Sequence, residues 1–249
     1  MTYNPYSLEG KTILITGASS GIGRATALEC SKLGARCVLT ARNEERLQAT
    51  HAALEGEGHT LIVADLTIKE DVDKLVNEVP ELDGLVNNAG FTKLLPIQFI
   101  NEDDFQSIMH VNTIAPVLLM QRLLKKKKLK KASSIVFTSS MAGMGASSVG
   151  NGMYTASKGA VSAFIRCAAL ELSSRGMRVN AVCPAMVNTG IMDSGAVSDE
   201  QLKEDIKNYP LGRYGEPNDV AYAIIYLLSE ASSWVTGTNL IIDGGYTLK

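Results

Sequence analysis

The sequence lacks the features that mark membrane, secreted and nucleic-acid-binding proteins. It contains no run of about 18 apolar residues, so no segment is expected to span a membrane. The first ten residues lack the basic segment and apolar stretch of a secretory signal. The formal net charge is only -2, whereas a nucleic-acid-binding surface is usually strongly basic. Nucleic acid is therefore not expected as the main ligand.

Cysteine and histidine are scarce, which limits the metal and hydrolytic chemistry open to the chain. Only three histidines occur, and none follows a predicted strand, so a Ser-His-Asp hydrolase is not expected. The four cysteines lie in apolar, regular segments without metal-ligand spacing: Cys30, Cys37, Cys167 and Cys183. We therefore expect no metal site, and four buried thiols in a reducing cytoplasm.

No low-complexity linker, composition break or short repeat divides the chain, so one domain is expected over residues 1–249. Short apolar, β-branched runs alternate with helical patterns, which predicts an α/β fold. The expected architecture is a single doubly wound Rossmann domain with a seven-stranded parallel sheet, whose ligands bind at the carboxyl ends of the strands. The expected strands are residues 11–16, 36–40, 60–64, 83–87, 134–138, 177–183 and 239–243.

Two other segments have distinctive patterns. Residues 101–131 are interpreted as one long helical region, kinked near Pro116. Asn112 lies in its apolar part, and a buried amide without a partner costs a few kcal/mol, so a polar role is expected for it. Residues 190–211 have mixed composition and are interpreted as a mobile substrate lid.

A glycine-rich loop, Gly17-Ala-Ser-Ser-Gly21-Ile-Gly23, follows the first predicted strand and precedes a helical pattern. Glycines there let the backbone approach a pyrophosphate held at the helix N-terminus, and Ser19 and Ser20 add hydroxyl donors. Glycine-rich turns are common, so the loop alone is a weak signal. Its position between strand and helix predicts a dinucleotide site.

The second predicted strand leads into Ala41 and Arg42. An acidic residue near this point would hold the ribose 2′-hydroxyl of NAD, and none is present. A guanidinium pairs well with the 2′-phosphate of NADP, so Arg42 favours NADP(H) over NAD, although it also fits an ordinary exposed charge. Asp65 ends the third strand, where it fits either a cofactor contact or a helix N-cap.

Tyr154 and Lys158 are four positions apart in a helical pattern, so their side chains lie on one face. A phenol titrates near pH ~10, and a nearby ammonium lowers that value, which would make Tyr154 a usable proton donor at neutral pH. The same spacing occurs by chance on many surface helices. The other motifs of the chain therefore decide its meaning.

Taken together, these motifs resemble the short-chain dehydrogenase/reductase family over essentially the whole chain. The resemblance rests on Thr16–Gly23, Asn87-Asn-Ala-Gly90, Asn112, Ser140 and Tyr154-xxx-Lys158. It implies reduction of a carbonyl, or the reverse oxidation of an alcohol. In that chemistry Ser140 polarises the carbonyl oxygen, Tyr154 donates the proton, Lys158 tunes Tyr154 and holds the nicotinamide ribose, and Asn112 relays a proton. The cofactor-binding residues it implies are Gly17, Ser19, Ser20, Gly21, Ile22, Gly23, Thr40, Arg42, Asp65, Leu66, Asn88, Gly90, Tyr154, Lys158, Pro184, Val187 and Thr189.

Within the family the resemblance is closest to 3-oxoacyl-acyl-carrier-protein reductases of fatty acid biosynthesis, which implies a homotetramer and a carrier-bound acyl substrate. Lys131 and Arg175 fall where that group carries basic residues for its carrier protein, and six lysines occur in residues 125–131. A solvated helix end explains the lysine run equally simply. The segment after Gly90 departs from that group's usual pattern.

Two alternatives remain open. One is a sugar, polyol or secondary-alcohol dehydrogenase with a small-molecule substrate on the same scaffold. The other is a non-catalytic nucleotide-sensing protein, against which the presence of Ser140, Tyr154 and Lys158 argues.

Overall fold

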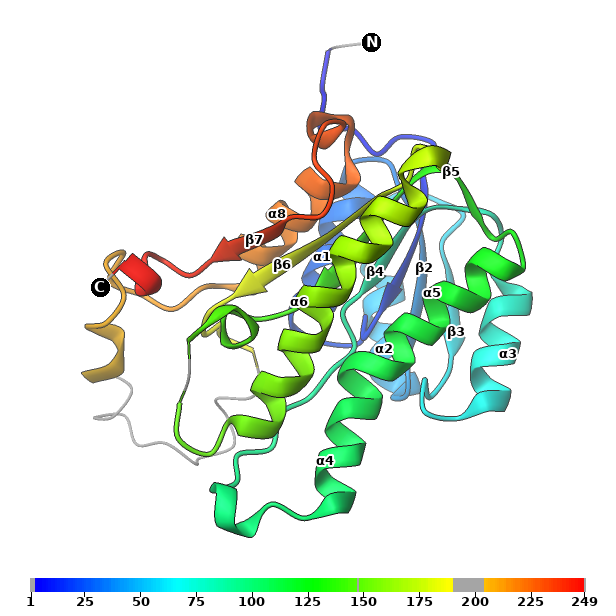
Figure 1. The fold of residues 1–249 in the computed structure, drawn as a ribbon. Helices are drawn as coiled ribbons and strands as arrows, with labels where there is room; N and C mark the ends of the chain where they lie inside the picture. The colour runs from blue at the N-terminus through cyan, green and yellow to red at the C-terminus, as the bar shows by residue number, and fades with distance from the viewer. Residues whose placement is uncertain (1–2, 147, 190–203, 249) are drawn as a thin grey trace.

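One parallel sheet organises the chain. The computed structural model describes residues 3–146, 148–189 and 204–248. Its seven strands lie in the order β3-β2-β1-β4-β5-β6-β7, and every neighbouring pair is parallel (Figure 1). The predicted α/β fold with a seven-stranded parallel sheet is confirmed. The strands are β1 (Thr12–Thr16), β2 (Arg36–Ala41), β3 (Thr60–Val63), β4 (Leu82–Asn87), β5 (Leu129–Thr138), β6 (Arg178–Pro184) and β7 (Asn239–Ile242).

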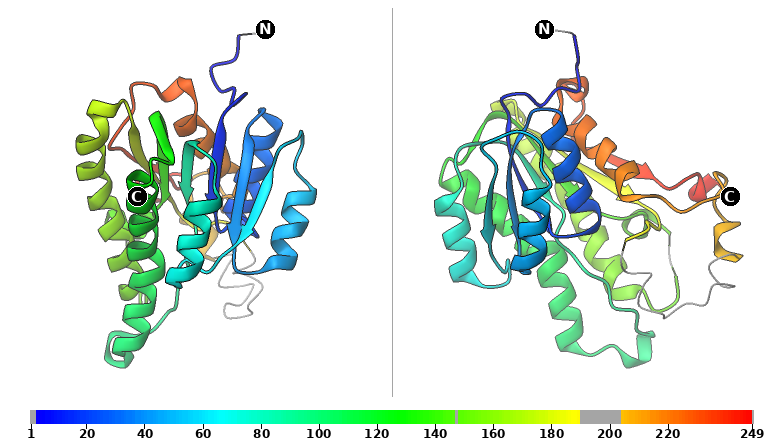
Figure 2. Two further views of the ribbon diagram at one scale, coloured as in Figure 1. Left: turned by 90° about the vertical axis from the view of Figure 1, so that its right-hand side faces the viewer. Right: turned by 180° about the vertical axis from the view of Figure 1, so that it is seen from behind.

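Helices cover both faces of the sheet, as the edge-on view in Figure 2 shows. The α-helices are α1 (Gly21–Lys32), α2 (Glu44–Ala52), α3 (Lys69–Glu78), α4 (Glu102–Met109), α5 (Ala115–Lys125), α6 (Gly152–Leu172) and α8 (Pro217–Leu228). One buried cluster joins the sheet to α3, α5 and α6, and a second joins it to α1, α2 and α8. Leu14 belongs to the first cluster and its neighbours Ile13 and Ile15 to the second, because successive side chains of a strand point to opposite faces. Burial on both faces explains why the strands are continuous apolar runs.

The strand order changes direction at β1. The chain leaves β1 for β2 on one side, while β4 pairs with the other side of β1. The loops that follow β1 and β4 therefore diverge and leave a crevice at the carboxyl ends of the strands. Gly17 begins the first of these loops with φ +65°, a conformation that favours glycine.

The predicted helix over residues 101–131 is partly wrong. Helix α4 ends at Met109, residues His110–Ile114 form a π-helical turn, and α5 ends at Lys125. Pro116 is the second residue of α5, in a backbone that stays helical from α4 through the π-helical turn. After a turn in which Lys127 has φ 56°, the chain enters β5 at Leu129. Leu129 is buried and pairs with Leu82, a long-range contact that local periodicity does not reveal.

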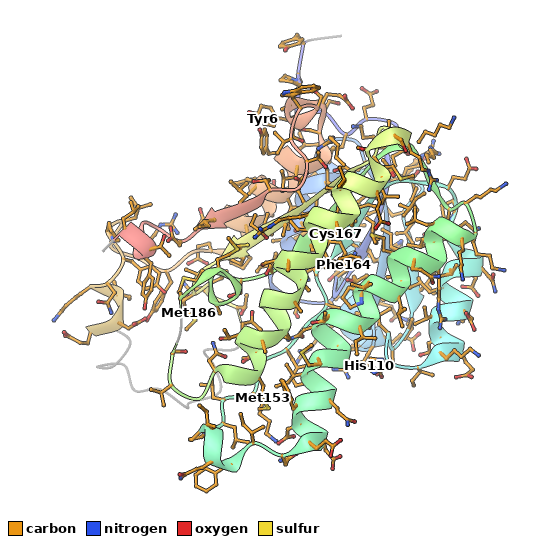
Figure 3. The ribbon with its side chains drawn as sticks, viewed as in Figure 1. Tyr6, His110, Met153, Phe164, Cys167 and Met186 are labelled. Atoms are coloured by element: carbon orange, nitrogen blue, oxygen red, sulfur yellow. The ribbon has the colours of Figure 1, made fainter. Side chains whose placement is uncertain are left out.

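Three smaller expectations also need comment. Cys30, Cys37 and Cys183 are buried, but Cys167 is exposed on the outer face of α6, so the prediction of four buried thiols is wrong (Figure 3). Asp65 is not a helix N-cap, because α3 begins at Lys69 after Ile68. The proposed lid at 190–211 lies mostly outside the described residues. Within the described parts of the chain, no helix is long and apolar enough to cross a membrane.

Candidate functional site

A cleft of about 640 Å³ opens at the carboxyl ends of the central strands. Fourteen of the predicted cofactor residues line it: Gly17, Ser19, Ser20, Gly21, Ile22, Thr40, Arg42, Asp65, Leu66, Asn88, Gly90, Tyr154, Lys158 and Thr189. Sequence reasoning missed several lining residues, among them Asn43, Arg46, Thr67, Phe91, Thr92, Val111 and Thr138. Asn43, Thr67, Phe91 and Thr92 lie within about five residues of the end of a strand, and Thr138 is the last residue of β5. This position was the signal that could have found them.

The glycine loop forms the floor of the cleft. A Cβ on Gly17 would lie 3.0 Å from Asn88 Nδ2, so a side chain there would crowd the loop after β4. A Cβ on Gly23 would lie 2.3 Å from the carbonyl oxygen of Gly17, so Gly23 lets α1 pack against the loop and does not line the cleft. Ser20, the N-cap of α1, makes no side-chain capping bond. The first N–H groups of α1 have no intrahelical partner and are suited to an anionic ligand.

Pro184 and Val187 lie behind the cleft rather than on its wall. Pro184 ends β6, and its carbonyl oxygen accepts a hydrogen bond from Ser140 Oγ at 3.5 Å. Val187 is buried and pairs with Gly215 in an isolated bridge. The structure therefore places both residues as supports for the chain that leads to Thr189.

Hydrogen bonds through Asn88 join the loops after β1, β4 and β5. The Asn88 backbone N–H donates to Thr16 Oγ1 at 2.9 Å, and its side-chain amide donates to the Thr16 carbonyl at 3.2 Å. Thr138 Oγ1 donates to Asn88 Oδ1 at 3.2 Å, while the Thr138 carbonyl accepts from Lys158 Nζ at 2.7 Å. Lys158 is thus connected to the glycine loop through two residues.

Tyr154 and Lys158 line one end of the cleft, and Ser140, which is buried and does not line it, lies next to Tyr154. Ser140 follows β5 in extended conformation, Tyr154 lies in the first turn of α6, and Lys158 lies one turn later. Lys158 Nζ is 5.7 Å from the centroid of the Tyr154 ring, and the Ser140 hydroxyl is hydrogen-bonded to Tyr154. The neighbouring Ser139 Oγ donates to the Lys158 carbonyl at 3.0 Å, away from this hydroxyl pair.

Burial dominates the titration of this group. Burial raises the pKa of Tyr154, and the hydrogen bond from Ser140 offsets this only in part. Burial also lowers the pKa of Lys158 to about 8. The pKa of Tyr154 thus lies above its ordinary value, contrary to the prediction that the ammonium would lower it, because the loss of solvent is the largest effect. At neutral pH the phenol keeps its proton and most Lys158 side chains are charged.

Asn112 lies in the π-helical turn, and both its side-chain oxygen and its side-chain nitrogen form hydrogen bonds within the protein. Asn112 Oδ1 accepts from the Phe91 N–H at 3.0 Å, and Nδ2 donates to the Phe91 carbonyl at 2.9 Å and to Ser157 Oγ at 3.0 Å. These bonds join the loop after β4 to α6. A Cβ on Gly90 would lie 3.0 Å from Asn112 Oδ1 and 3.4 Å from Lys158 Nζ, so a side chain at this position would crowd the Asn112 amide.

Two arginines and one carboxylate lie at the opposite end of the cleft. Arg42 follows β2, Arg46 lies in the first turn of α2, and Asp65 follows β3. Arg42 Nη1 is 3.5 Å from Asp65 Oδ2. Thr40 also lines this region, and its buried Oγ1 has no hydrogen-bond partner. A buried hydroxyl without a partner usually indicates a missing ligand or water.

The lysine run lies far from the cleft within one chain. It spans the end of α5 and the start of β5, and α6 carries the chain about 30 Å from Tyr154 to Arg175 (Figure 1). A Cβ on Gly176 would lie 3.7 Å from Ala132, so Lys131 and Arg175 do share one region. That region is at the amino ends of the strands, so it does not border the mouth of the same chain's cleft.

Comparison with known proteins identifies the family. The family profile described as Enoyl-(Acyl carrier protein) reductase matches residues 17–247. A 3-oxoacyl-[acyl-carrier-protein] reductase FabG of Rickettsia prowazekii (strain Madrid E) is 36% identical over 238 residues, covering 96% of this chain and 97% of the relative. The chain belongs to the short-chain dehydrogenase/reductase family.

Other short-chain dehydrogenases/reductases are similar to nearly the same extent. Glucose 1-dehydrogenase of Gluconobacter oxydans (strain 621H) is 36% identical over 246 residues, covering 96% of this chain and 92% of the relative. A crystal structure from Beutenbergia cavernae has a TM-score of 0.89 and 30% identity, and it covers 99% of this chain and 100% of that chain. That protein is described as an NAD(P)-dependent gluconate 5-dehydrogenase with bound NADP at low occupancy. This short-chain dehydrogenase/reductase is accordingly an oxidoreductase, and its relatives do not agree on a substrate.

The residues of the cleft fit a nicotinamide dinucleotide. The uncapped N-terminus of α1 and the glycine loop suit a pyrophosphate, and the unpartnered Thr40 hydroxyl is available to a polar group at the other end. In the described residues, no group of three or more His, Cys, Asp or Glu side chains is arranged to hold a metal ion.

Proposed function

We propose that this chain reduces a ketone with NADPH, and that its substrate is of the 3-oxoacyl class. One observation carries the proposal: Ser140 and Tyr154 lie together beside the Lys158 ammonium, where Tyr154 and Lys158 line one end of the cleft. Two hydroxyl donors that converge on one point suit a carbonyl oxygen on which negative charge develops.

The cofactor would be held along the cleft by the residues that line it. The α1 N-terminus and the glycine loop would hold the pyrophosphate. Arg42 and Arg46 would hold the 2′-phosphate, because position 41 carries alanine and not a carboxylate that would repel it. When bound, the reduced nicotinamide supplies the hydride that the carbonyl carbon receives. Phosphate recognition by the two arginines is the basis for NADPH rather than NADH.

Tyr154 supplies the proton in this mechanism. Its raised pKa keeps the phenol protonated at neutral pH, which is the state that reduction requires. Ser140 donates its hydroxyl hydrogen to the same oxygen and disperses the developing charge. The reverse oxidation needs the phenolate as a base, so its rate should rise with pH while reduction is favoured near neutrality.

Lys158 and Asn112 organise the site around Tyr154. The Thr138 carbonyl fixes Lys158 Nζ, whose charge favours the phenolate that remains after proton transfer. Asn112 holds the Phe91 backbone and Ser157 with three hydrogen bonds. We therefore assign its side chain a positioning role, because passing a proton through this amide would break bonds that hold the loop after β4.

Apolar side chains near the mouth favour an acyl substrate over a sugar. The Leu95 N–H donates to the Gly150 carbonyl at 2.8 Å, which joins the segment after β4 to the segment before α6. On these two segments Leu94 is 62% exposed and Val149 is 92% exposed. Lys93 is already paired with Asp104 at 2.6 Å. Exposed apolar groups of this kind suit a hydrocarbon, whereas a polyol needs unpaired polar groups.

A sugar or polyol dehydrogenase is the second candidate, because relatives of that kind are as similar as the reductases.

We also propose a homotetramer, on the basis of large apolar side chains exposed on the helices of one face: Phe105, Ile114, Leu118 and Leu170. In such an assembly, a carrier protein bound near Lys131 and Arg175 would serve a neighbouring chain's site rather than that of its own chain.

Tyr154→Phe tests the mechanism. The change keeps the ring and removes the proton donor, so turnover of an acetoacetyl thioester with NADPH should fall by about 10² or more while cofactor binding survives. Absorbance measures the consumption of NADPH with the thioester. The formation of NADPH from NADP+ with glucose tests the competing substrate class in the same way. Tyr222→Phe on the exposed side of α8 is the matched control and should retain full activity. Full activity in Tyr154→Phe would rule the mechanism out.

A further inference from the structure

The Asp65 carboxylate is already paired with Arg42, the guanidinium that would bind the 2′-phosphate. Arg42 Nη1 lies 3.5 Å from Asp65 Oδ2, and both residues line the cleft. The Arg42 side chain is 72% exposed and that of Asp65 only 23% exposed. Arg42 can therefore turn toward a ligand without unfolding anything, while Asp65 stays in place. This pair joins residues that follow two neighbouring strands, β2 and β3.

Local hydrogen bonds fix the Asp65 carboxylate. Asp65 Oδ1 accepts from the Thr67 N–H at 2.8 Å and from Thr67 Oγ1 at 2.7 Å, while the Asp65 N–H donates to Asp71 Oδ2 at 2.8 Å. Burial acts to raise the pKa of Asp65, but the bonds from Thr67 and the charge of Arg42 together bring it below its usual value. A fixed negative charge is consequently present at neutral pH.

The negative charge of Asp65 would lie close to a phosphate bound by Arg42. A phosphate oxygen within about 4 Å of Arg42 lies within about 8 Å of the Asp65 carboxylate, which is no more than about one Debye length at physiological salt. The two anions therefore repel each other and compete for one guanidinium. A ribose 2′-hydroxyl carries no charge and is not subject to this repulsion.

Arg46 supplies a second positive charge at the same end of the cleft. It lies in the first turn of α2, where Asn43 Oδ1 accepts from the Arg46 N–H at 2.8 Å and caps the helix. Among the described residues Arg46 forms no salt bridge, unlike Arg42. Its charge is therefore not shared with a carboxylate, and the adjacent helix N-terminus adds to the positive potential.

We propose that Asp65 is a selectivity residue that weakens the chain's preference for 2′-phosphorylated cofactor by sharing Arg42, and that Arg46 is the cation that restores the preference. The inference depends on the proposed use of NADPH. It assigns to the chain a moderate preference for NADPH over NADH, set by the balance of one carboxylate against two guanidinium groups. Removing the carboxylate should sharpen that preference, and removing Arg46 should weaken it.

Adenosine 2′,5′-bisphosphate and 5′-AMP are suitable probes, because they occupy only this end of the cleft and bind without turnover. Asp65→Asn keeps the oxygen that accepts from Thr67 but removes the charge. Calorimetric titration should show adenosine 2′,5′-bisphosphate binding about three- to fivefold more tightly to Asp65→Asn, as expected for one partly exposed charge contact. Binding of 5′-AMP should change by less than about twofold, because it lacks the competing phosphate.

Asp71→Asn is the matched control, since it makes the same change in net charge in the first turn of α3 without contacting Arg42, and its amide oxygen can still accept from the Asp65 N–H. Its ratio of the two affinities should equal that of the unaltered protein. Arg46→Gln, a second variant, should weaken adenosine 2′,5′-bisphosphate binding selectively. Circular dichroism melting establishes that each variant is folded.

Equal changes for both probes in Asp65→Asn, or no change, would overturn the selectivity role and leave Asp65 as a residue that only positions the loop. The same conclusion would follow if Asp71→Asn shifted the ratio as much as Asp65→Asn does. A different result tests the proposed cofactor itself. If neither Arg42→Ala nor Arg46→Gln weakens the binding of adenosine 2′,5′-bisphosphate, NADPH use by this chain is refuted, whatever Asp65→Asn shows.

Discussion

Replacing Lys158 by methionine should remove activity and stabilise the fold at neutral pH. Lys158 is 4% exposed, and burial lowers its pKa from 10.5 to about 8. A difference of one pH unit between two pKa values corresponds to about 1.4 kcal/mol, so keeping the Lys158 ammonium charged in the folded protein costs about 3 kcal/mol at pH 7. Methionine has a similar length and carries no charge. It loses the 2.7 Å hydrogen bond to the Thr138 carbonyl, worth about 1 kcal/mol, so the net gain should be about 2 kcal/mol.

The gain should disappear at high pH, and the sign follows from proton binding. Between about pH 8 and 10.5 the unfolded chain binds more protons at Lys158 than the folded chain does, so stability of the unaltered protein rises with pH across that window. The free-energy cost of burying the Lys158 ammonium has its full value below about pH 8. From pH 7 to pH 9.5 this cost should fall by about 2 kcal/mol in the unaltered protein, whereas Lys158→Met has no such group and should show no corresponding change. Other titrating groups are common to both proteins and cancel in the difference.

Urea unfolding of both proteins at pH 7 and pH 9.5, at one protein concentration, measures this difference. Lys128→Met is the control: its ammonium also donates to a backbone carbonyl, that of Val79 at 2.6 Å, but it lies in the turn between α5 and β5 and is only half-buried. No pH-dependent gain is expected there. The reasoning fails if Lys158→Met is less stable than the unaltered protein at pH 7, or if the difference between them stays constant up to pH 9.5.

Two further predictions concern packing and the distant basic region. Gly23→Ala should destabilise the fold by at least about 2 kcal/mol in thermal or urea unfolding, because its Cβ would lie 2.3 Å from a backbone oxygen, whereas Gly152→Ala meets nothing within 4 Å and should be neutral. Equal stability of the two variants would contradict this. Lys131→Glu combined with Arg175→Glu should leave the turnover of a small thioester unchanged at all salt concentrations, and any loss would show that the region affects catalysis itself rather than carrier binding.

Patterns within about ten residues were sufficient to predict much of this protein. The alternating apolar runs predicted all seven strands, since burial on both faces of a parallel sheet requires continuous β-branched and aliphatic segments. The position of the glycine loop between β1 and α1 predicted where a dinucleotide would lie. The four-residue spacing of Tyr154 and Lys158 predicted that they share one helix face, because helix geometry is local.

Features that depend on contacts between distant segments required the tertiary structure. Leu129 joins β5 because it pairs with Leu82, so the predicted helix ended too late. The same topology carries the lysine run to the far end of the sheet. Asn112 is committed to Phe91 and Ser157, which no local pattern indicates.

The electrostatics of the site were also decided by the tertiary structure. The sequence placed an ammonium one turn from Tyr154 and suggested a lowered pKa, yet burial raises it, because solvent exclusion is a property of the packed molecule. Arg42 and Asp65 are far apart in sequence, and only the pairing of β2 with β3 brings their charges together. Sequence therefore specified which groups are present, while packing set how strongly each one is charged and which partner it meets.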